Sequence, residues 1–207
     1  MTKLFYAPGS CALGIHVLLE EVGKPFDLHK INLMEKEQLK PEYVAINPKA
    51  KVPALQRDDG SILTEWPAIA TWLALTNPDK GLISTDPEKM ARTLEAVDYV
   101  AASLHMQGFT RMWRPDHFTP NEADYPAIKA KGQEIVDKGL AFFDKQLAGK
   151  DYLGGAQMSI ADAALFYLEF WIAERVKQKL PENCAQHYAR MRARPSVQKA
   201  LADEGLV

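Results

Sequence analysis

The first 80 residues show two different periodicities of hydrophobic positions. Ala12, Ile15, Leu19 and Val22 follow the spacing of an amphipathic helix, which comes directly after an apolar, strand-like run at residues 3–6. Further along, short apolar runs are separated by turn residues, which is typical of strands and hairpins. The other predicted elements are a strand at 29–33, a weakly helical segment at 34–44, a hairpin at 52–57 and 62–63, and a helix from Thr64 to Asn77-Pro78.

The second part of the chain is predicted to be entirely helical. Residues 79–86 are rich in Asp, Gly, Pro, Ser and Thr and read as a linker. After them the helical period continues without a convincing strand pattern. The predicted domains are therefore 1–78, an α/β domain, and 87–207, a helical domain. The predicted helices span 86–112, 124–147 and 159–176, with a loop at 113–120 and two shorter helices separated by Arg194-Pro195.

Composition narrows the classes of function. The chain has 207 residues and a net charge of −2, so no basic surface points to a nucleic-acid partner. Its two cysteines, Cys11 and Cys184, lie far apart in the sequence, and a chain of this length needs no disulfide for stability. This cysteine usage fits a reducing compartment. We find no signal peptide and no apolar stretch of membrane-spanning length, and we expect a cytoplasmic protein without a membrane partner.

Ser10 and Cys11 are the first candidates for chemistry, because they stand at the start of the first predicted helix. There the unpaired N–H groups and the positive end of the helix dipole favour a thiolate. The dipole alone lowers a thiol pKa by about one unit, and direct N–H bonds must supply the rest. The alternative is that Ser10 caps the helix and Cys11 is a small buried residue. These residues alone support both interpretations equally.

Several short motifs follow one another in a definite order along the chain. They are Pro8-Gly9-Ser10-Cys11, Asn47-Pro48-Lys49, Val52-Pro53-Ala54-Leu55, Asp59-Gly60, Leu63-Thr64-Glu65, Ser159-Ile160-Ala161-Asp162 and Arg194-Pro195-Ser196-Val197. Each motif alone is weak, whereas their order and spacing together are specific, and they resemble the cytosolic glutathione transferases, with the bacterial beta class most similar. The resemblance covers essentially the whole chain and implies an α/β N-terminal thioredoxin-like domain, an all-α C-terminal helical domain and a homodimer.

The resemblance implies a glutathione site around Val52, Pro53 and Glu65. A cis Val52-Pro53 bond would leave the backbone groups of Val52 free for an extended tripeptide. Alone, Pro53 would more simply protect an edge strand. Glu65 would bind the γ-glutamyl amine, although an acid in a first helical turn normally just complements the helix dipole.

Three further positions near this site follow from the resemblance. Many members have Ser where this chain has Trp66, so the contact there falls to the backbone N–H, and the indole could narrow the pocket. Lys36 and Lys51 match positions that contact the glycyl carboxylate or stabilise a thiolate. Alone, each would be read as a solvated surface lysine.

The helical domain supplies the remaining candidates. Asp98 and His105 lie seven residues apart, hence on one face of an α-helix, and their counterparts line a cleft between domains or subunits. His105 is predicted to bond near Cys11 or its bound thiol, or else to be satisfied by a neighbour. Ser159 and Asp162 read as a structural capping box. The candidates for a hydrophobic co-substrate pocket, each of which could instead be core, are Tyr6, Phe109, Trp113 and Tyr167.

The resemblance thus implies an enzyme that conjugates glutathione to hydrophobic electrophiles, with Cys11 as first and Ser10 as second choice for the activating residue. Thiol–disulfide exchange through Cys11 competes with conjugation, and the absence of a Cys-x-x-Cys pair favours a monothiol route. No metal and no cofactor beyond glutathione is expected. The alternatives are a non-catalytic binding or partner-assembly protein with Trp66 in the pocket, and an isomerase that uses glutathione catalytically.

Overall fold

The computed structural model describes residues 1–207, which divide into two compact units. The first contains Met1–Ser84 together with Arg190–Val207, and the second contains Thr85–Ala189. The prediction that 87–207 forms one helical domain is therefore wrong for the last segment. Its helix packs on the first helix of the chain, and Arg194 Nε lies 2.7 Å from Glu21 Oε1.

The first unit is built on a four-stranded mixed sheet in the order β2-β1-β3-β4. β1 pairs in parallel with β2 and antiparallel with β3, so Leu4 lies opposite both Leu28 and Leu55. The second strand begins three residues earlier than predicted, because pairing with β1 fixes its register and ends with the Ile31 N–H bonded to the Tyr6 carbonyl. The strands are β1 (Thr2–Tyr6), β2 (Phe26–Lys30), β3 (Ala54–Gln56) and β4 (Ile62–Thr64).

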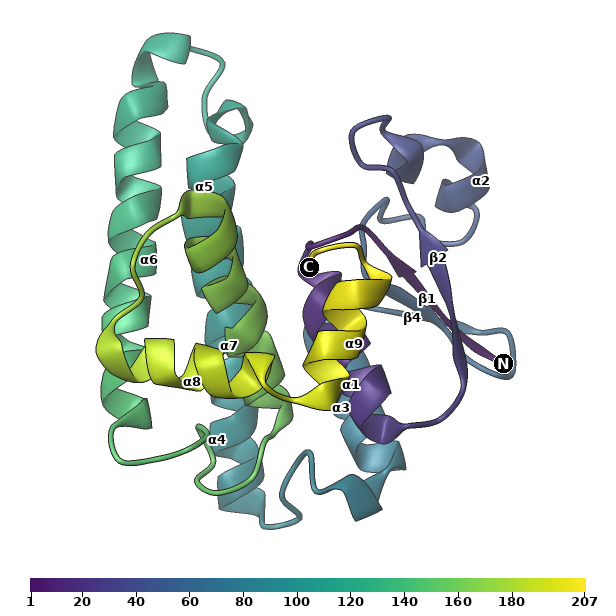
Figure 1. The fold of residues 1–207 in the computed structure, drawn as a ribbon. Helices are drawn as coiled ribbons and strands as arrows, with labels where there is room; N and C mark the ends of the chain where they lie inside the picture. Colours follow the sequence, from purple (N-terminus) through teal and green to yellow (C-terminus); the bar gives the residue numbers. More distant parts are fainter. The chain divides into compact units, whose positions relative to one another are not determined.

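Helices α1, α3 and α9 lie together on one side of this sheet (Figure 1). α1 is buried along most of its length and ends at Gly23, whose φ of 72° suits glycine. The predicted cap at Thr64 is wrong, because Thr64 ends β4 and Glu65 takes the N-cap position. The helical segments are α1 (Ala12–Val22), η1 (Glu37–Leu39), α2 (Pro41–Val44), α3 (Trp66–Thr76), η2 (Pro78–Lys80) and α9 (Pro195–Asp203).

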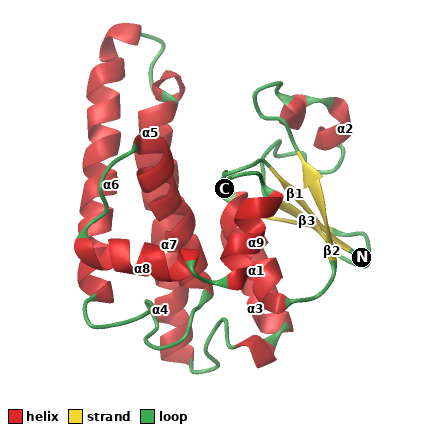
Figure 2. Ribbon diagram, in the orientation of Figure 1, coloured by secondary structure: helices red, strands yellow, loops and turns green.

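The second unit consists of helices joined by loops and contains no strand, as Figure 2 shows. The predicted helices at 86–112, 124–147 and 159–176 are confirmed, but two of them contain π-helical stretches that the periodicity does not predict. One continuous helix comprises α4, η3 and α5. The segments are α4 (Pro87–Asp98), η3 (Tyr99–Phe109), α5 (Thr110–Trp113), η4 (Pro115–His117), η5 (Glu122–Asp124), α6 (Tyr125–Leu147), α7 (Ile160–Phe170), η6 (Trp171–Val176) and α8 (Glu182–Arg192), whose last turn belongs to the first unit.

The predicted capping box at the start of α7 is present. Ser159 Oγ accepts the N–H of Ala161, and Asp162 Oδ2 accepts the N–H of Ser159 at 2.7 Å. α7 itself is buried along its whole length. No helix in the structure is both long enough and apolar enough to cross a bilayer.

Glycines bring α6 close to η3. A Cβ atom on Gly132 would lie 2.6 Å from the Gly108 carbonyl oxygen, which as a backbone atom cannot rotate away. We expect Gly132→Ala to cost about 1–3 kcal/mol through overpacking, seen as a lower midpoint of thermal unfolding. Gly154→Ala is the matched control, because that position faces open space. Equal midpoints for the two variants would contradict the close approach.

Candidate functional site

The loop before α1 is held rigidly by hydrogen bonds. Gly9 has a φ of 62°, and its N–H donates to the buried Glu204 carboxylate at 2.7 Å. Ser10 closes a turn onto the Ala7 carbonyl at 3.0 Å, and its Oγ accepts the Ala12 N–H at 3.2 Å. The hydroxyl of Ser10 is therefore engaged with the start of the helix, as the capping interpretation predicts.

Cys11 is buried at the N-cap of α1, and its Sγ donates to the Val52 carbonyl at 3.7 Å. Burial raises the pKa of the thiol to about 12, which the N–H groups of Cys11 and Ala12 and the charge of Lys51 only partly offset. Of the two interpretations that the sequence left open, this burial favours Cys11 as a small buried residue over Cys11 as a thiolate. The helix terminus is present, but desolvation outweighs it.

The Val52 peptide is positioned by a polar network. The Lys51 carbonyl accepts hydrogen bonds of 2.7 Å from both the Tyr43 hydroxyl and the Asn47 amide. The Val52-Pro53 bond is cis, which confirms the implication of the resemblance. The Val52 N–H has no hydrogen-bond partner in the chain, whereas its carbonyl accepts the Cys11 thiol. One donor is therefore open beside the sulfur.

Glu65 presents its carboxylate at the start of α3. Its φ of 70° is unusual for a non-glycine residue, and its side chain is 60% exposed. Lys49, which was not predicted as a site residue, lies with its Nζ 2.8 Å from Glu65 Oε1 and 2.9 Å from Thr64 Oγ1. The Asn47-Pro48-Lys49 motif marked this lysine in the sequence, but nothing local showed which acid it would meet.

Trp66 connects the acidic end of the site to the cysteine. Its Nε1 donates to the Cys11 carbonyl at 3.0 Å, and the residue is buried. The indole therefore packs inside the first unit while the Glu65 carboxylate stays exposed. This placement speaks against the alternative in which the indole fills the pocket.

The two predicted lysines differ in their surroundings. Lys51 lies close enough for its charge to lower the pKa of Cys11. Lys36 is exposed in a left-handed conformation with φ of 54°, and its ammonium makes no hydrogen bond or ion pair within the chain. The structure brings Lys51 to the cysteine and does not bring Lys36 there.

In the helical unit, Asp98 and His105 do not share the environment that their spacing predicts. The segment η3 between them is a π-helix, in which each backbone N–H bonds to the carbonyl five residues earlier; the Thr110 N–H, for example, bonds to the His105 carbonyl. A π-helix has more residues per turn than an α-helix, so two residues seven apart no longer lie on one face. Asp98 is exposed, whereas the half-buried His105 ring meets Trp171 at 4.8 Å between centroids and Tyr167 at 5.9 Å. The prediction of a shared face is wrong.

The predicted pocket aromatics have mostly become core. Tyr6 is buried in the first unit, where burial, Glu204 and Asp203 raise the pKa of its hydroxyl. Phe109 and Tyr167 have no exposed surface, and the ring of each packs against Trp171. They therefore belong to the core of the helical unit and offer no surface to a ligand.

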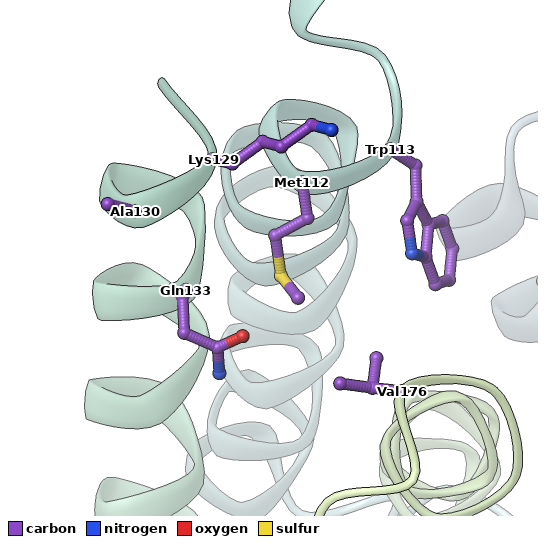
Figure 3. Close-up of a pocket in the computed structure, with 6 residues that line it drawn as sticks. All are labelled: Met112, Trp113, Lys129, Ala130, Gln133 and Val176. Carbon is purple, nitrogen blue, oxygen red and sulfur yellow. The ribbon is translucent and has the colours of Figure 1, made fainter. Parts of the chain in front are cut away.

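Trp113 is the candidate that reaches open space. Its side chain is 42% exposed and borders a cavity of about 410 Å³ in the helical unit (Figure 3). The lining is apolar at Met112, Trp113 and Val176 and polar at Lys129 and Gln133. Such a mixture suits an apolar ligand with a polar substituent.

Comparison with known proteins identifies the family. Residues 9–76 match the N-terminal domain of glutathione S-transferases, and residues 109–190 match their C-terminal domain. The chain belongs to the glutathione S-transferase family of enzymes, with a thioredoxin-like N-terminal domain and a helical C-terminal domain.

Individual relatives agree over their full length. The sequence is 41% identical to glutathione S-transferase GstA of Escherichia coli O157:H7, with 99% of each chain covered. A beta-class glutathione S-transferase of Sphingomonas chungbukensis superposes with a TM-score of 0.84 at 33% identity, covering 99% of this chain and 100% of that one. A Sulfitobacter glutathione transferase homologue, solved with bound glutathione, gives 0.90 at 28% identity, covering 100% and 99%.

Proposed function

We propose that this enzyme conjugates the thiol of glutathione to hydrophobic electrophiles, with the glutathione site formed by Cys11, Val52 and Glu65. The observation that carries the proposal is the Cys11 thiol bonded to the Val52 carbonyl beside an unpaired Val52 N–H. The exposed Glu65 carboxylate begins the adjacent helix, and Trp66 links that helix to the Cys11 backbone. Bound glutathione in the Sulfitobacter relative supports the same ligand here.

Glutathione fits this arrangement as an extended peptide. Its backbone can pair with the open Val52 N–H in the manner of an added strand. The γ-glutamyl ammonium then meets the Glu65 carboxylate, and the first-turn N–H groups of α3 meet the γ-glutamyl carboxylate. Lys49 must share Glu65 with the incoming ammonium, because it occupies one carboxylate oxygen in the structure.

The protonated state of Cys11 suits conjugation. A neutral thiol that now donates to the Val52 carbonyl can donate instead to the glutathione sulfur, which stabilises the glutathione thiolate. The glutathione thiol releases its proton to solvent, and its sulfur then forms the new bond to the electrophilic carbon. The leaving group, a halide in the case of an aryl halide, departs with the electron pair of the carbon–halogen bond that breaks. His105 as a partner of the bound thiol, and Asp98 and Lys36 as ligand contacts, stay predictions.

Intact-protein mass spectrometry and a conjugation assay with an aryl halide test the assignment. We expect Cys11→Ala to lower the conjugation rate and to abolish the mixed disulfide that forms with oxidised glutathione. Ser10→Ala, which loses only the bond to the Ala12 N–H, should keep the mixed disulfide. If Cys11→Ala retains full conjugation and Ser10→Ala loses it, Ser10 is the activating residue.

Failure of the folded protein to bind immobilised glutathione would favour the non-catalytic alternative.

Thiol–disulfide exchange through Cys11 should depend steeply on pH. Because burial raises the pKa of this thiol to about 12, its thiolate fraction grows about tenfold for each pH unit below that value. We expect the rate of mixed-disulfide formation to rise by about this factor from pH 7 to pH 8 and again to pH 9. A plateau below pH 8, measured by quenched mass spectrometry, would show that Cys11 is a thiolate at neutral pH.

The electrophile is proposed to contact Trp113, which is the predicted aromatic with an exposed face. Trp113→Ala should then raise the KM for the electrophile and leave the KM for glutathione unchanged.

A homodimer and a cytoplasmic location are likewise proposed from the family. Sedimentation equilibrium at micromolar concentration tests the dimer.

A further inference from the structure

His16 is a buried histidine with one ring nitrogen left unpaired. It lies on α1 with no exposed surface, and its Nδ1 is 3.0 Å from Glu204 Oε1. Its Nε2 is buried and has no hydrogen-bond partner. Because the carboxylate can only accept, the bond to Glu204 places the proton on Nδ1 in the neutral ring. Nε2 then offers a lone pair.

Two carboxylates face this lone pair from different elements. Glu20 lies one helical turn along α1, with Oε1 3.9 Å from His16 Nε2, and Asp203 lies at the end of α9, with Oδ2 3.7 Å away. The three ligand atoms are all within 4.8 Å of one another. A lone pair and two anions converging on one point call for a cation between them.

We propose that His16, Glu20 and Asp203 bind a divalent transition-metal ion of the zinc type. With metal–ligand bonds of about 2.0–2.2 Å, a tetrahedral site has its donors roughly 3.3–3.6 Å apart. The two distances to His16 Nε2 exceed this range by a few tenths of an ångström. The Glu20 and Asp203 oxygens lie within 4.8 Å of each other, so these partly exposed carboxylates must approach by at most about 1.2 Å. An imidazole donor favours zinc or its neighbours over magnesium or calcium, and water completes the fourth position.

Glu204 supplies the support that such histidine ligands normally have. A carboxylate on the second ring nitrogen fixes the tautomer and the ring orientation of a metal-binding histidine. The other oxygen of Glu204 accepts the Gly9 N–H at 2.7 Å. A metal bound by His16 would therefore be connected to the Cys11 loop through this one carboxylate, and it would clamp α9 onto α1.

The ammonium of Lys199 balances the charge of the two carboxylates in the structure. Its Nζ lies 2.6 Å from Asp203 Oδ2 and 3.5 Å from Glu20 Oε1. The lysine side chain is 57% exposed and flexible, so it can leave toward solvent when a metal arrives. Lys199 and a metal ion would compete for the same two carboxylates. Removing a carboxylate should therefore weaken metal binding, and removing the lysine should strengthen it.

The experiment is a calorimetric titration of the full chain with Zn²⁺ in the absence of glutathione. All proteins carry Cys11→Ser, so that a thiol does not bind the metal. We expect Asp203→Asn to weaken Zn²⁺ binding at least tenfold. Lys199→Met should tighten binding by about three- to tenfold, because the competing ammonium is gone. Both positions are partly exposed, and circular dichroism checks that both variants fold.

Nitrogen NMR identifies the ligand atom. Zn²⁺ should shift the Nε2 resonance of His16 and leave its Nδ1 bonded to Glu204. The proposal is overturned if Asp203→Asn binds Zn²⁺ as tightly as the parent, if Lys199→Met binds more weakly, or if the His16 Nε2 resonance does not move at saturating metal.

Discussion

Asp162→Ala is expected to destabilise the helical unit by about 3–5 kcal/mol, because it leaves several buried polar groups without partners. The Asp162 carboxylate is completely buried and accepts four hydrogen bonds. The donors are the Ser159 N–H at 2.7 Å, the Ser159 hydroxyl at 2.8 Å, the Leu153 N–H at 2.7 Å and His187 Nε2 at 3.2 Å. The change should appear as a large drop in the midpoint of thermal unfolding.

Ser159→Ala is the matched control for this prediction. It removes the cap hydroxyl of the same helix but leaves Asp162 bonded to Leu153 and His187, so a cost of about 1 kcal/mol is expected. Equal losses for the two variants would show that Asp162 acts as a cap alone and that its bonds to Leu153 and His187 contribute nothing.

The same cluster gives the stability a definite pH dependence. Burial tends to lower the pKa of His187, but the charge of Glu169 and the bonds to Asp162 and Glu169 raise it to about 10. A histidine pKa raised above its unfolded value of about 6.5 stabilises the fold fully below that pH. This contribution is lost as the pH rises from about 6.5 toward 10. The midpoint of thermal unfolding should fall over this range, and it should fall less in His187→Gln.

Glu65→Gln should weaken glutathione binding by about 10- to 150-fold, which corresponds to one charge-assisted hydrogen bond of about 1.5–3 kcal/mol. The amide keeps the shape and the acceptor oxygen of Glu65 but removes the charge that the γ-glutamyl ammonium would meet. Its 60% exposure places the expected effect toward the lower end of that range. Isothermal titration with glutathione measures the change directly.

Glu88→Gln provides a comparison in the other unit. Glu88 is also exposed and paired, with Oε1 3.0 Å from Arg92 Nε, and it should bind glutathione like the parent. A loss of less than twofold in Glu65→Gln would remove Glu65 from the glutathione site and leave the amine contact to another group.

Local patterns predicted most of the fold. The helical period places α1, α6 and α7 closely, and the hairpin follows from two apolar runs around Asp59-Gly60. These features depend on neighbours a few residues away, which a sequence displays directly. The cis bond at Val52-Pro53 was implied only by the family resemblance.

The errors, and the alternatives left open, concern interactions between residues distant in the chain. The raised pKa of Cys11 depends on how deeply the fold buries it, which no spacing reveals. α9 joins the first unit through the pairs Arg194–Glu21 and Glu204–Gly9, whose members are more than 170 residues apart. Lys49 and Glu65 meet because β3 and β4 form a hairpin, and neither residue alone indicates the other.

The return of α9 to the first unit imposes an order of assembly during synthesis. Gly9 leaves the ribosome early, whereas its partner Glu204 is made 195 residues later. Until then α1 lacks the apolar cover of Val197, Ala200 and Leu201. A nascent chain stalled after residue 84 should therefore recruit chaperones that recognise exposed apolar helices, whereas the complete chain should release them once the last helix has docked.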